Sequence, residues 1–371
     1  MDAVSVRFSV GPLLKEDVMT TSDGATVVGG VDCHSRFHHA VALDGSGRRL
    51  GDRAFPASGP GYAGLLGWLR GFGTVTVVGV ESTGSYGATL TRFLLQAGMR
   101  VVEVNQPHAH LRRRRGKTDA VDAEAAARKV LAGEATAIPK EMNGAVEAIR
   151  QVRLTRRSAV SARTVALCQL GDLIVTAPAV IRARLSRKTL RGQAGICARM
   201  RPNRRALTDP VQAAKLALRT LARRIAALDA EIAQLDEHLE QLVRAIAPRT
   251  IALLGIGPQH AGQLLVTAGQ NITRLHSEAA FAHLCGVDPI PASSGKTTRH
   301  RLNPGGDRQA NSALHRIAVV RLRYCERTRA YAARRTTEGR SKREIIRCLK
   351  RYIAQEVYRT LCADLASVTV A

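Results

Sequence analysis

The first third of the chain combines strand-like and helix-like patterns of apolar residues. Apolar runs with strand character lie at 26–32, 37–43, 48–55, 75–80 and 100–104. Helical patterns lie between them at 59–71 and 87–97, and a longer one follows at 119–131. Three antiparallel strands that lead into strand–helix–strand units predict an α/β domain with a mixed sheet over residues 26–140. Residues 1–25 form an extension that we expect to be flexible.

The middle of the chain is helical throughout. From 141 to 210 the pattern is basic, with interruptions around 174–180 and 201–210. Apolar residues then recur in steps of three and four, at Leu218, Leu221, Ile225, Leu228, Ile232, Leu235, Leu239, Leu242 and Ile246. This heptad register predicts a coiled coil, so residues 141–247 are expected to form a basic helical region and coiled-coil linker. One long helix packed on its own domain is the alternative, but the narrow seam favours self-association into a homo-oligomer, a dimer or tetramer.

Residues 248–371 are predicted to form a mainly α C-terminal domain. It opens with a helix-hairpin-helix-like segment, in which Gly255, Gly257 and Pro258 make a turn between two short helices. Such a turn either presents backbone N–H groups to a phosphate or is an inert helical hairpin, and the pattern leaves both open. The tail is expected to form two basic helices along a phosphate backbone, the last opening with a capping box at Ser341 and Glu344.

Charge separates the two parts of the chain. The 371 residues include 56 Lys and Arg against 30 Asp and Glu, a net charge of +26. Residues 1–111 carry equal numbers of both signs, so the whole excess lies in 112–371. An excess of this size, mostly arginine, indicates a polyphosphate partner. Aromatic residues make up only 4% of the chain, which argues against extensive base stacking.

Other features exclude several classes of protein. No stretch approaches the ~18 consecutive apolar residues of a membrane span, and charged residues interrupt the first 24 positions, where a secretory signal would need an apolar run. Seven cysteines without a C-x-x-C pair argue against a disulfide framework or a zinc ribbon. We therefore expect a cytoplasmic protein with no membrane partner.

Four carboxylates stand at positions where a catalytic site can form. Asp32 ends the first strand, Glu81 ends the central buried strand, and Asp119 and Asp122 fall three apart near the start of a helix. The last two therefore share one helical face. Four carboxylates around one point require hard cations, which predicts Mg²⁺, with Mn²⁺ as a substitute. Two such ions can hold the attacking and leaving oxygens of phosphoryl transfer. Each carboxylate taken singly also has a structural explanation, such as a favourable interaction with the helix dipole.

The blocks around these carboxylates resemble the signature of the DEDD transposases of the insertion sequence 110 family. They are residues 30–34 (GVDCH), 80–86 (VESTGSY) and 116–123 (GKTDAVDA). A further stretch resembles that family's C-terminal transposase domain, at 285–289 (CGVDP), 293–296 (SSGK) and 305–311 (GGDRQAN). The likeness spans roughly residues 26–360.

The resemblance implies an N-terminal RNase H-like (RuvC-like) domain, a coiled-coil linker and a C-terminal transposase domain with an essential serine. It implies a bacterial, nucleoid-associated recombinase of a mobile element that acts on target and donor DNA and is guided by a non-coding bridge RNA. By residue match, Asp32, Glu81, Asp119 and Asp122 would hold Mg²⁺. Ser294 would be the nucleophile that forms a phosphoserine link, with the adjacent Ser293 as the alternative.

Phosphate contacts are expected from basic residues and turn glycines in and near these blocks. They are Arg112, Arg113, Arg114, Arg115, Lys117, Lys296, Arg299, Arg301, Arg308, Gly255 and Gly257. Two other functions remain open: a junction-resolving nuclease without a covalent serine step, and a non-catalytic nucleic-acid-binding scaffold. The chain shows no base-reading helix or finger motif, which agrees with guidance by base pairing.

Overall fold

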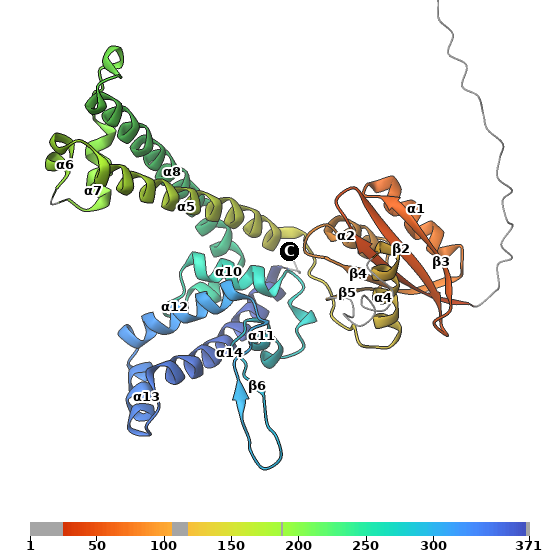
Figure 1. The fold of residues 1–371 in the computed structure, drawn as a ribbon. Helices are drawn as coiled ribbons and strands as arrows, with labels where there is room; N and C mark the ends of the chain where they lie inside the picture. The colour runs from red at the N-terminus through yellow and green to blue at the C-terminus, as the bar shows by residue number, and fades with distance from the viewer. Residues whose placement is uncertain (1–24, 106–117, 187, 369–371) are drawn as a thin grey trace, which may run out of the picture. The chain divides into compact units, whose positions relative to one another are not determined.

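The computed structural model describes residues 25–105, 118–186 and 188–368 (Figure 1). The predicted extension up to residue 24 lies outside these ranges, and so do the predicted phosphate contacts of Arg112, Arg113, Arg114, Arg115 and Lys117. The chain divides into two compact units, one ending at Lys140 and the other beginning at Glu141. Each unit is described by itself.

The first unit is built on a five-stranded mixed sheet. Its strands are β1 (Thr26–Cys33), β2 (Phe37–Asp44), β3 (Arg49–Pro56), β4 (Thr74–Glu81) and β5 (Val101–Val104). Their order across the sheet is β3-β2-β1-β4-β5, in which β1 to β3 are antiparallel while β4 and β5 run parallel to β1. The predicted mixed α/β sheet is therefore confirmed, with all five strands.

Strand alternation sorts the side chains of this sheet between two apolar layers. On β1, Val27 packs in the layer with helices α1 (Gly59–Arg70) and α2 (Ala88–Gln96). Its neighbour Val28 packs in the other layer, beneath α4 (Asp119–Leu131). Helices therefore cover both faces of the sheet, and α4 lies on the face shared by the even-numbered residues of β1.

Two glycines let α4 approach the sheet closely. A Cβ atom at Gly30 would lie 2.2 Å from the carbonyl oxygen of Ala123, and one at Gly79 would lie 2.6 Å from Cγ2 of Val130. Real Cβ atoms do not tolerate such contacts, so no other residue fits at Gly30 unless the α4 backbone moves. The close approach fixes where the first turn of α4 lies.

We expect Gly30→Ala to destabilise the first unit by about 3 kcal/mol, because the new methyl group must displace the backbone of α4. Gly67→Ala in α1 is the matched control, since a Cβ there meets nothing within 4 Å. That variant should be neutral or more stable by up to about 1 kcal/mol. The single tryptophan, Trp68, lies in the first unit, so its fluorescence during urea unfolding measures both. Equal stability of the two variants would contradict this packing.

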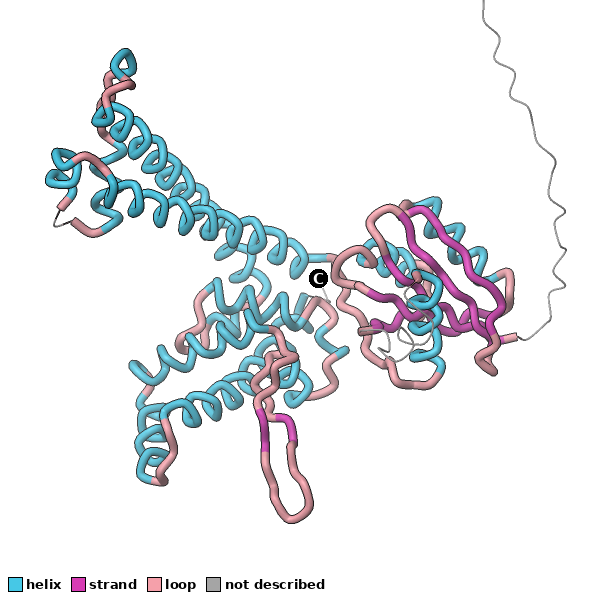
Figure 2. The backbone as a smooth tube through the Cα atoms, viewed as in Figure 1, coloured by secondary structure: helices cyan, strands magenta, loops and turns pink. Residues whose placement is uncertain are grey.

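The second unit is almost entirely helical (Figure 2). Its helices are α5 (Gly144–Thr176), α6 (Ala179–Leu185), α7 (Leu190–Ala198), α8 (Pro210–Ile246), α9 (Pro248–Ile251), α10 (Pro258–Ala268), α11 (Glu278–Leu284), α12 (Arg308–Tyr324), α13 (Glu326–Thr337) and α14 (Lys342–Val368). A small hairpin joins β6 (Ile290–Pro291) and β7 (His300–Arg301). The helical C-terminal region is confirmed.

The basic tail contains three helices where the sequence predicted two. The break falls at Cys325, whose extended backbone ends α12 and begins α13. No Gly or Pro marks this break, which is why the pattern missed it. The capping box that opens α14 is confirmed, because the Ser341 hydroxyl donates to Glu344 at 2.8 Å and accepts from its backbone N–H at 3.4 Å.

Helices α5 and α8 pack side by side as an antiparallel pair (Figure 1). Ion pairs join Arg156 to Asp236 and Arg163 to Asp229 along this pair. One row of the heptad seam is buried within the unit, at Leu218, Ile225, Ile232, Leu239 and Ile246. The other row is partly buried, at Leu221, Leu228, Leu235 and Leu242. The seam thus has a partner in its own chain, which is the alternative that the heptad pattern left open.

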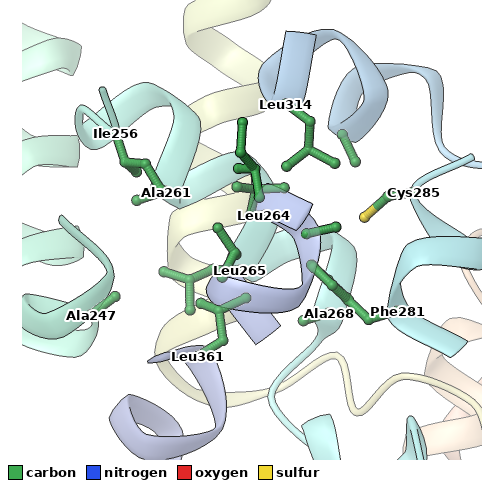
Figure 3. Close-up of a cluster of buried hydrophobic side chains, with 14 of the residues drawn as sticks. Ala247, Ile256, Ala261, Leu264, Leu265, Ala268, Phe281, Cys285, Leu314 and Leu361 are labelled. Atoms are coloured by element: carbon green, nitrogen blue, oxygen red, sulfur yellow. The ribbon is translucent and has the colours of Figure 1, made fainter. Parts of the chain in front are cut away.

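The main core of the second unit lies where the α5–α8 pair meets the C-terminal helices (Figure 3). Leu264 and Leu265 of α10 are fully buried there, with Phe281 of α11 and Leu314 of α12. Leu239 near the end of α8 belongs to the same core. Residues on both sides of position 247 therefore share one core, although the sequence placed a domain boundary there.

One described helix, α5, has a stretch long and apolar enough by composition to cross a membrane. A single such helix is weak evidence, because core helices pass the same test. Ion pairs of Arg156 and Arg163 fasten α5 to α8, and charged residues of this kind are costly inside a bilayer.

Candidate metal centre

Two predicted site residues end neighbouring parallel strands. The last paired residues of the parallel strands β1 and β4 are Val31 and Val80. Asp32 and Glu81 directly follow them on the two strands. Neighbouring residues in register on parallel strands point to the same face. Asp32 lies two residues after Gly30, and therefore faces α4. Both carboxylates thus stand at one edge of the sheet, on its α4 face.

The first turn of α4 brings two more carboxylates to this edge. The Thr118 side chain caps the helix by accepting from the backbone N–H of Val121 at 3.3 Å. Asp119 and Asp122 follow within the first turn. Asp122 is 3% exposed and Asp32 is 8% exposed, whereas the Asp119 side chain is 42% exposed. The site is therefore buried on the sheet side and open on the Asp119 side.

His34 joins the carboxylates of the two elements. Its Nε2 atom lies 3.1 Å from Oδ2 of Asp32 and 3.2 Å from Oδ1 of Asp119. The backbone N–H of His34 bonds to the carbonyl oxygen of Phe37 at 3.1 Å, so the β1–β2 turn holds the residue in place. Ligand atoms of Asp32, His34 and Asp119 all lie within 4.8 Å of one another, as in a site that could hold a metal ion.

Carboxylate repulsion acts on Asp32. Burial raises the pKa of Asp32, His34 opposes this, and the charges of Asp122 and Asp119 raise it further. The structure therefore brings Asp32, Asp119 and Asp122 into mutual electrostatic contact. A divalent cation would relieve both the burial cost and the repulsion.

Glu81 lies at the same end of the sheet. Its charge acts on the thiol of Cys33. Burial, Asp32 and Glu81 together raise the pKa of the Cys33 thiol, which keeps this cysteine protonated and unreactive. After Glu81 the chain leaves the strand sharply, because Ser82 has a left-handed backbone with φ 57°. This turn ends β4 directly at the carboxylate.

The donor set fits a hard divalent cation. Carboxylate oxygens are the ligands that Mg²⁺ and Mn²⁺ prefer in proteins. Sequence reasoning singled out the carboxylates but missed His34 as a member of the site. The available signal was its position two residues after Asp32 in the GVDCH block, just past the strand end.

Comparison with known proteins decides the family. A family model for the DEDD transposase domain, described as "Transposase", matches residues 29–177, and one described as "Transposase IS116/IS110/IS902 family" matches residues 251–333. The chain belongs to the IS110 family of transposases. The first match contains all four predicted carboxylates, and the second contains Ser294.

A curated relative of this chain is an "Insertion element IS900 uncharacterized 42 kDa protein" of Mycobacterium paratuberculosis. The two are 27% identical over 143 residues, which is 38% of this chain. The alignment spans 36% of the relative's own length.

The predicted nucleophile lies in the β6–β7 hairpin of the second unit. Ser294 and Thr297 exchange backbone hydrogen bonds of 3.2 and 3.1 Å around Gly295, whose φ is +55°. The Ser293 hydroxyl accepts from the backbone N–H of Arg299 at 3.2 Å. By contrast, the Ser294 hydroxyl makes no hydrogen bond to any residue that the structure describes. The hairpin therefore displays Ser294 at an exposed tip.

The other predicted phosphate contacts divide into two groups. Exposed cations are Lys296, Arg299, Arg301 and Arg308. The glycines belong to the segment before α10, where Gly255 has φ +83° and Gly257 is the N-cap. Pro258 is the first residue of α10. The helix before this turn, α9, has four residues.

Proposed function

We propose that this protein is the transposase of an insertion element and that it cuts and rejoins DNA at a divalent-metal site formed by Asp32, Glu81, Asp119 and Asp122. One observation carries the proposal. Carboxylates from a strand end and from a helix start gather around His34, within a chain of the IS110 transposase family. The mixed sheet with its β3-β2-β1-β4-β5 order supports an RNase H-like (RuvC-like) fold for this unit.

The residues of the site have different tasks in this proposal. The buried Asp32 and Asp122 fix the inner side of the site, and Asp119 reaches it from the open side, where DNA has access. His34 orients Asp32 and Asp119 through its contacts at 3.1 and 3.2 Å. A bound Mg²⁺ or Mn²⁺ supplies stabilisation of the negative charge that develops on the scissile phosphate.

Ser294 is proposed to be the nucleophile. Its oxygen forms a bond to the phosphorus of a DNA phosphodiester while the bond to one deoxyribose oxygen breaks, and that oxygen takes the serine proton. Because one phosphate ester is exchanged for another, rejoining needs no external energy source. The exposed tip position and the free hydroxyl of Ser294 support this choice over Ser293, whose hydroxyl is bonded across the hairpin.

The proposal also includes how the protein is directed to its DNA sites and how copies of the chain associate. The sequence shows no base-reading motif beside its charge of +26, which supports guidance by a non-coding bridge RNA that pairs with target and donor DNA. A homo-oligomer is part of the proposal, although the α8 seam that suggested it packs against α5 of the same chain. The setting is the nucleoid of a bacterial cytoplasm.

Metal removal tests the enzymatic proposal. Protein expressed with the non-coding flanks of the element should cleave DNA that carries an element junction, and dialysis against EDTA should lower the rate by at least about 100-fold. Addition of Mg²⁺ or Mn²⁺ should restore it, because dialysis leaves the carboxylates that would hold the ion unchanged. Gel electrophoresis of end-labelled DNA measures the rate. Undiminished cleavage in EDTA would exclude a metal-dependent reaction.

A junction-resolving nuclease is the second candidate. The residues of the acidic cluster all belong to the first unit. Hydrolysis of DNA at such a cluster would require no serine from the second unit, which favours this candidate. The two candidates differ in whether a DNA strand becomes attached to the protein.

A further inference from the structure

A basic cavity of about 550 Å³ lies within the second unit, between α5, α10 and α12. Five arginines and one histidine line it, namely Arg150, Arg153, Arg156, Arg157, Arg316 and His260. The lining contains a single carboxylate, that of Asp307. The cavity therefore carries a large positive excess that no function assigned so far uses.

Some of these cations are neutralised and others are not. Arg150 pairs with Glu147 at 2.7 Å, and Arg156 pairs with Asp236 at 2.5 Å. Neither Arg157 nor Arg316 has an ion pair or a hydrogen bond among the residues that the structure describes. These two unpaired guanidinium groups come from different helices, α5 and α12, and face the same cavity.

Arg153 is held in place without being neutralised. Its Nη1 donates to the carbonyl oxygen of Gln259 at 2.5 Å, and its Nη2 donates to Oε1 of Gln263 at 2.8 Å. Burial and the charges of Arg156 and Arg157 lower its pKa to about 10. The Asp307 carboxylate opposes this shift. A half-buried guanidinium group that is oriented by neutral acceptors beside other arginines is stabilised by an anion.

His260 adds an unsatisfied polar atom to the same cavity. Its Nδ1 atom is buried and has no hydrogen-bond partner in the described part of the chain. Burial and the charges of Arg316 and Arg153 lower its pKa, so the imidazole is neutral at pH 7. Buried polar atoms of this kind are normally satisfied, and a bound oxyanion beside His260 would favour the protonated ring as donor.

We propose that this cavity binds a phosphodiester group of a nucleic-acid backbone between Arg153, Arg157 and Arg316. The inference rests on the proposed function, which supplies the nucleic acid, and adds a binding site apart from both the acidic cluster and the serine hairpin. Arginine forks from two helices can grip the two free oxygens of one phosphate. His260 and Gln259 lie in the first turn of α10, whose backbone N–H groups add positive potential.

The test compares two double variants that lose the same charge. Arg157→Gln with Arg316→Gln removes the unpaired cations of the cavity, and Arg223→Gln with Arg224→Gln removes two exposed cations of α8 outside it. Anisotropy of labelled DNA duplex and of labelled RNA, over a salt series, measures binding to each full-length protein. The cavity variant should lose at least about tenfold in affinity for one of the two nucleic acids, with a salt slope lower by about 1, because one phosphate contact is lost.

The control variant should lose less than about threefold, because scattered surface charges contribute weakly. The nucleic acid whose affinity falls in the cavity variant, DNA or RNA, is the one that the cavity binds. Equal losses in both double variants, or no loss in either, would overturn the proposal. Cleavage of element-junction DNA by the wild-type protein is measured separately. Loss of affinity confined to the cavity variant supports this site whether or not the wild type cleaves, so failure of the proposed function is a distinct outcome.

A pH series provides a second readout. The charged groups that face His260 are the cavity arginines and Asp307, with Asp236 bonded to Gln259 beside it. The imidazole of His260 is the cavity side chain that a bound anion would help to protonate between about pH 8 and about pH 6. Wild-type affinity should rise by roughly threefold over this range, and His260→Gln should remove that rise. An identical pH profile in both proteins would exclude His260 from the site.

Discussion

Asp32→Asn and Asp122→Asn should each abolish DNA cleavage in a protein that remains folded. Asparagine keeps the shape of aspartate but lacks its charge, so the cation site loses one of its buried ligands. We expect the cleavage rate on element-junction DNA to fall by roughly a thousandfold, the size typical of losing a group that stabilises charge in a transition state. End-labelled DNA measures the rate, and calorimetric titration with Mn²⁺ measures the accompanying loss of ion binding.

The fold should not suffer from the same change. Burial together with Asp119 and Asp122 raises the pKa of Asp32, so its ionised form is the one that the folded state disfavours. This cost is present above the raised pKa and disappears as the pH falls through it. A neutral asparagine removes the cost at pH 7, so the midpoint of urea unfolding, followed by Trp68 fluorescence, should be no lower than in the wild type without metal.

Asp172→Asn is the matched control, because Asp172 is an exposed carboxylate of α5 in the other unit. It should retain the wild-type rate. Normal cleavage by Asp32→Asn would remove the acidic cluster from the reaction. Binding of DNA by the wild-type protein without any cleavage, in the presence of Mg²⁺, would favour the non-catalytic scaffold.

The sheet and most helices could be predicted from the sequence because each local pattern agrees with the final fold. Each of these signals is contained in a short stretch of sequence. They are the two-residue period of the strands, the i,i+3 spacing of Asp119 and Asp122, and the N-cap at Thr118. The position of α4 on the sheet was not visible. A glycine such as Gly30 in a strand indicates only weak strand preference, and its role appears when the backbone of α4 is seen 2.2 Å from where its Cβ would lie.

Contacts between side chains were harder to predict from the sequence than the helices and strands. His34 gains its contact with Asp119 only when two elements far apart in sequence meet, so its position two residues after Asp32 points to one carboxylate of the site but not to the other. The heptad pattern of α8 predicts a seam but not what fills it, and α5 buries small residues such as Ala159 and Ala166 that carry little apolar signal. The basic cavity shows the same limit, because Arg153, His260 and Arg316 come from three helices.

Ser294→Ala should eliminate the covalent protein–DNA product and strand transfer. The change removes only the hydroxyl that the hairpin leaves without a partner, so the fold and DNA binding should remain as in the wild type. Loss of a nucleophile typically costs more than a thousandfold. Denaturing gels of the reaction with labelled DNA show the covalent product as a band that migrates with the protein.

Ser293→Ala is the control for this assignment. Its hydroxyl accepts from the Arg299 backbone at 3.2 Å, so its loss loosens the hairpin but leaves the proposed nucleophile in place. We expect a rate within about tenfold of the wild type, since one exposed hydrogen bond is worth about 1 kcal/mol. The reverse result would move the nucleophile to Ser293. If Ser294→Ala and Ser293→Ala both cut DNA at the normal rate and release it free of protein, water is the nucleophile, and the chain acts as a junction-resolving nuclease.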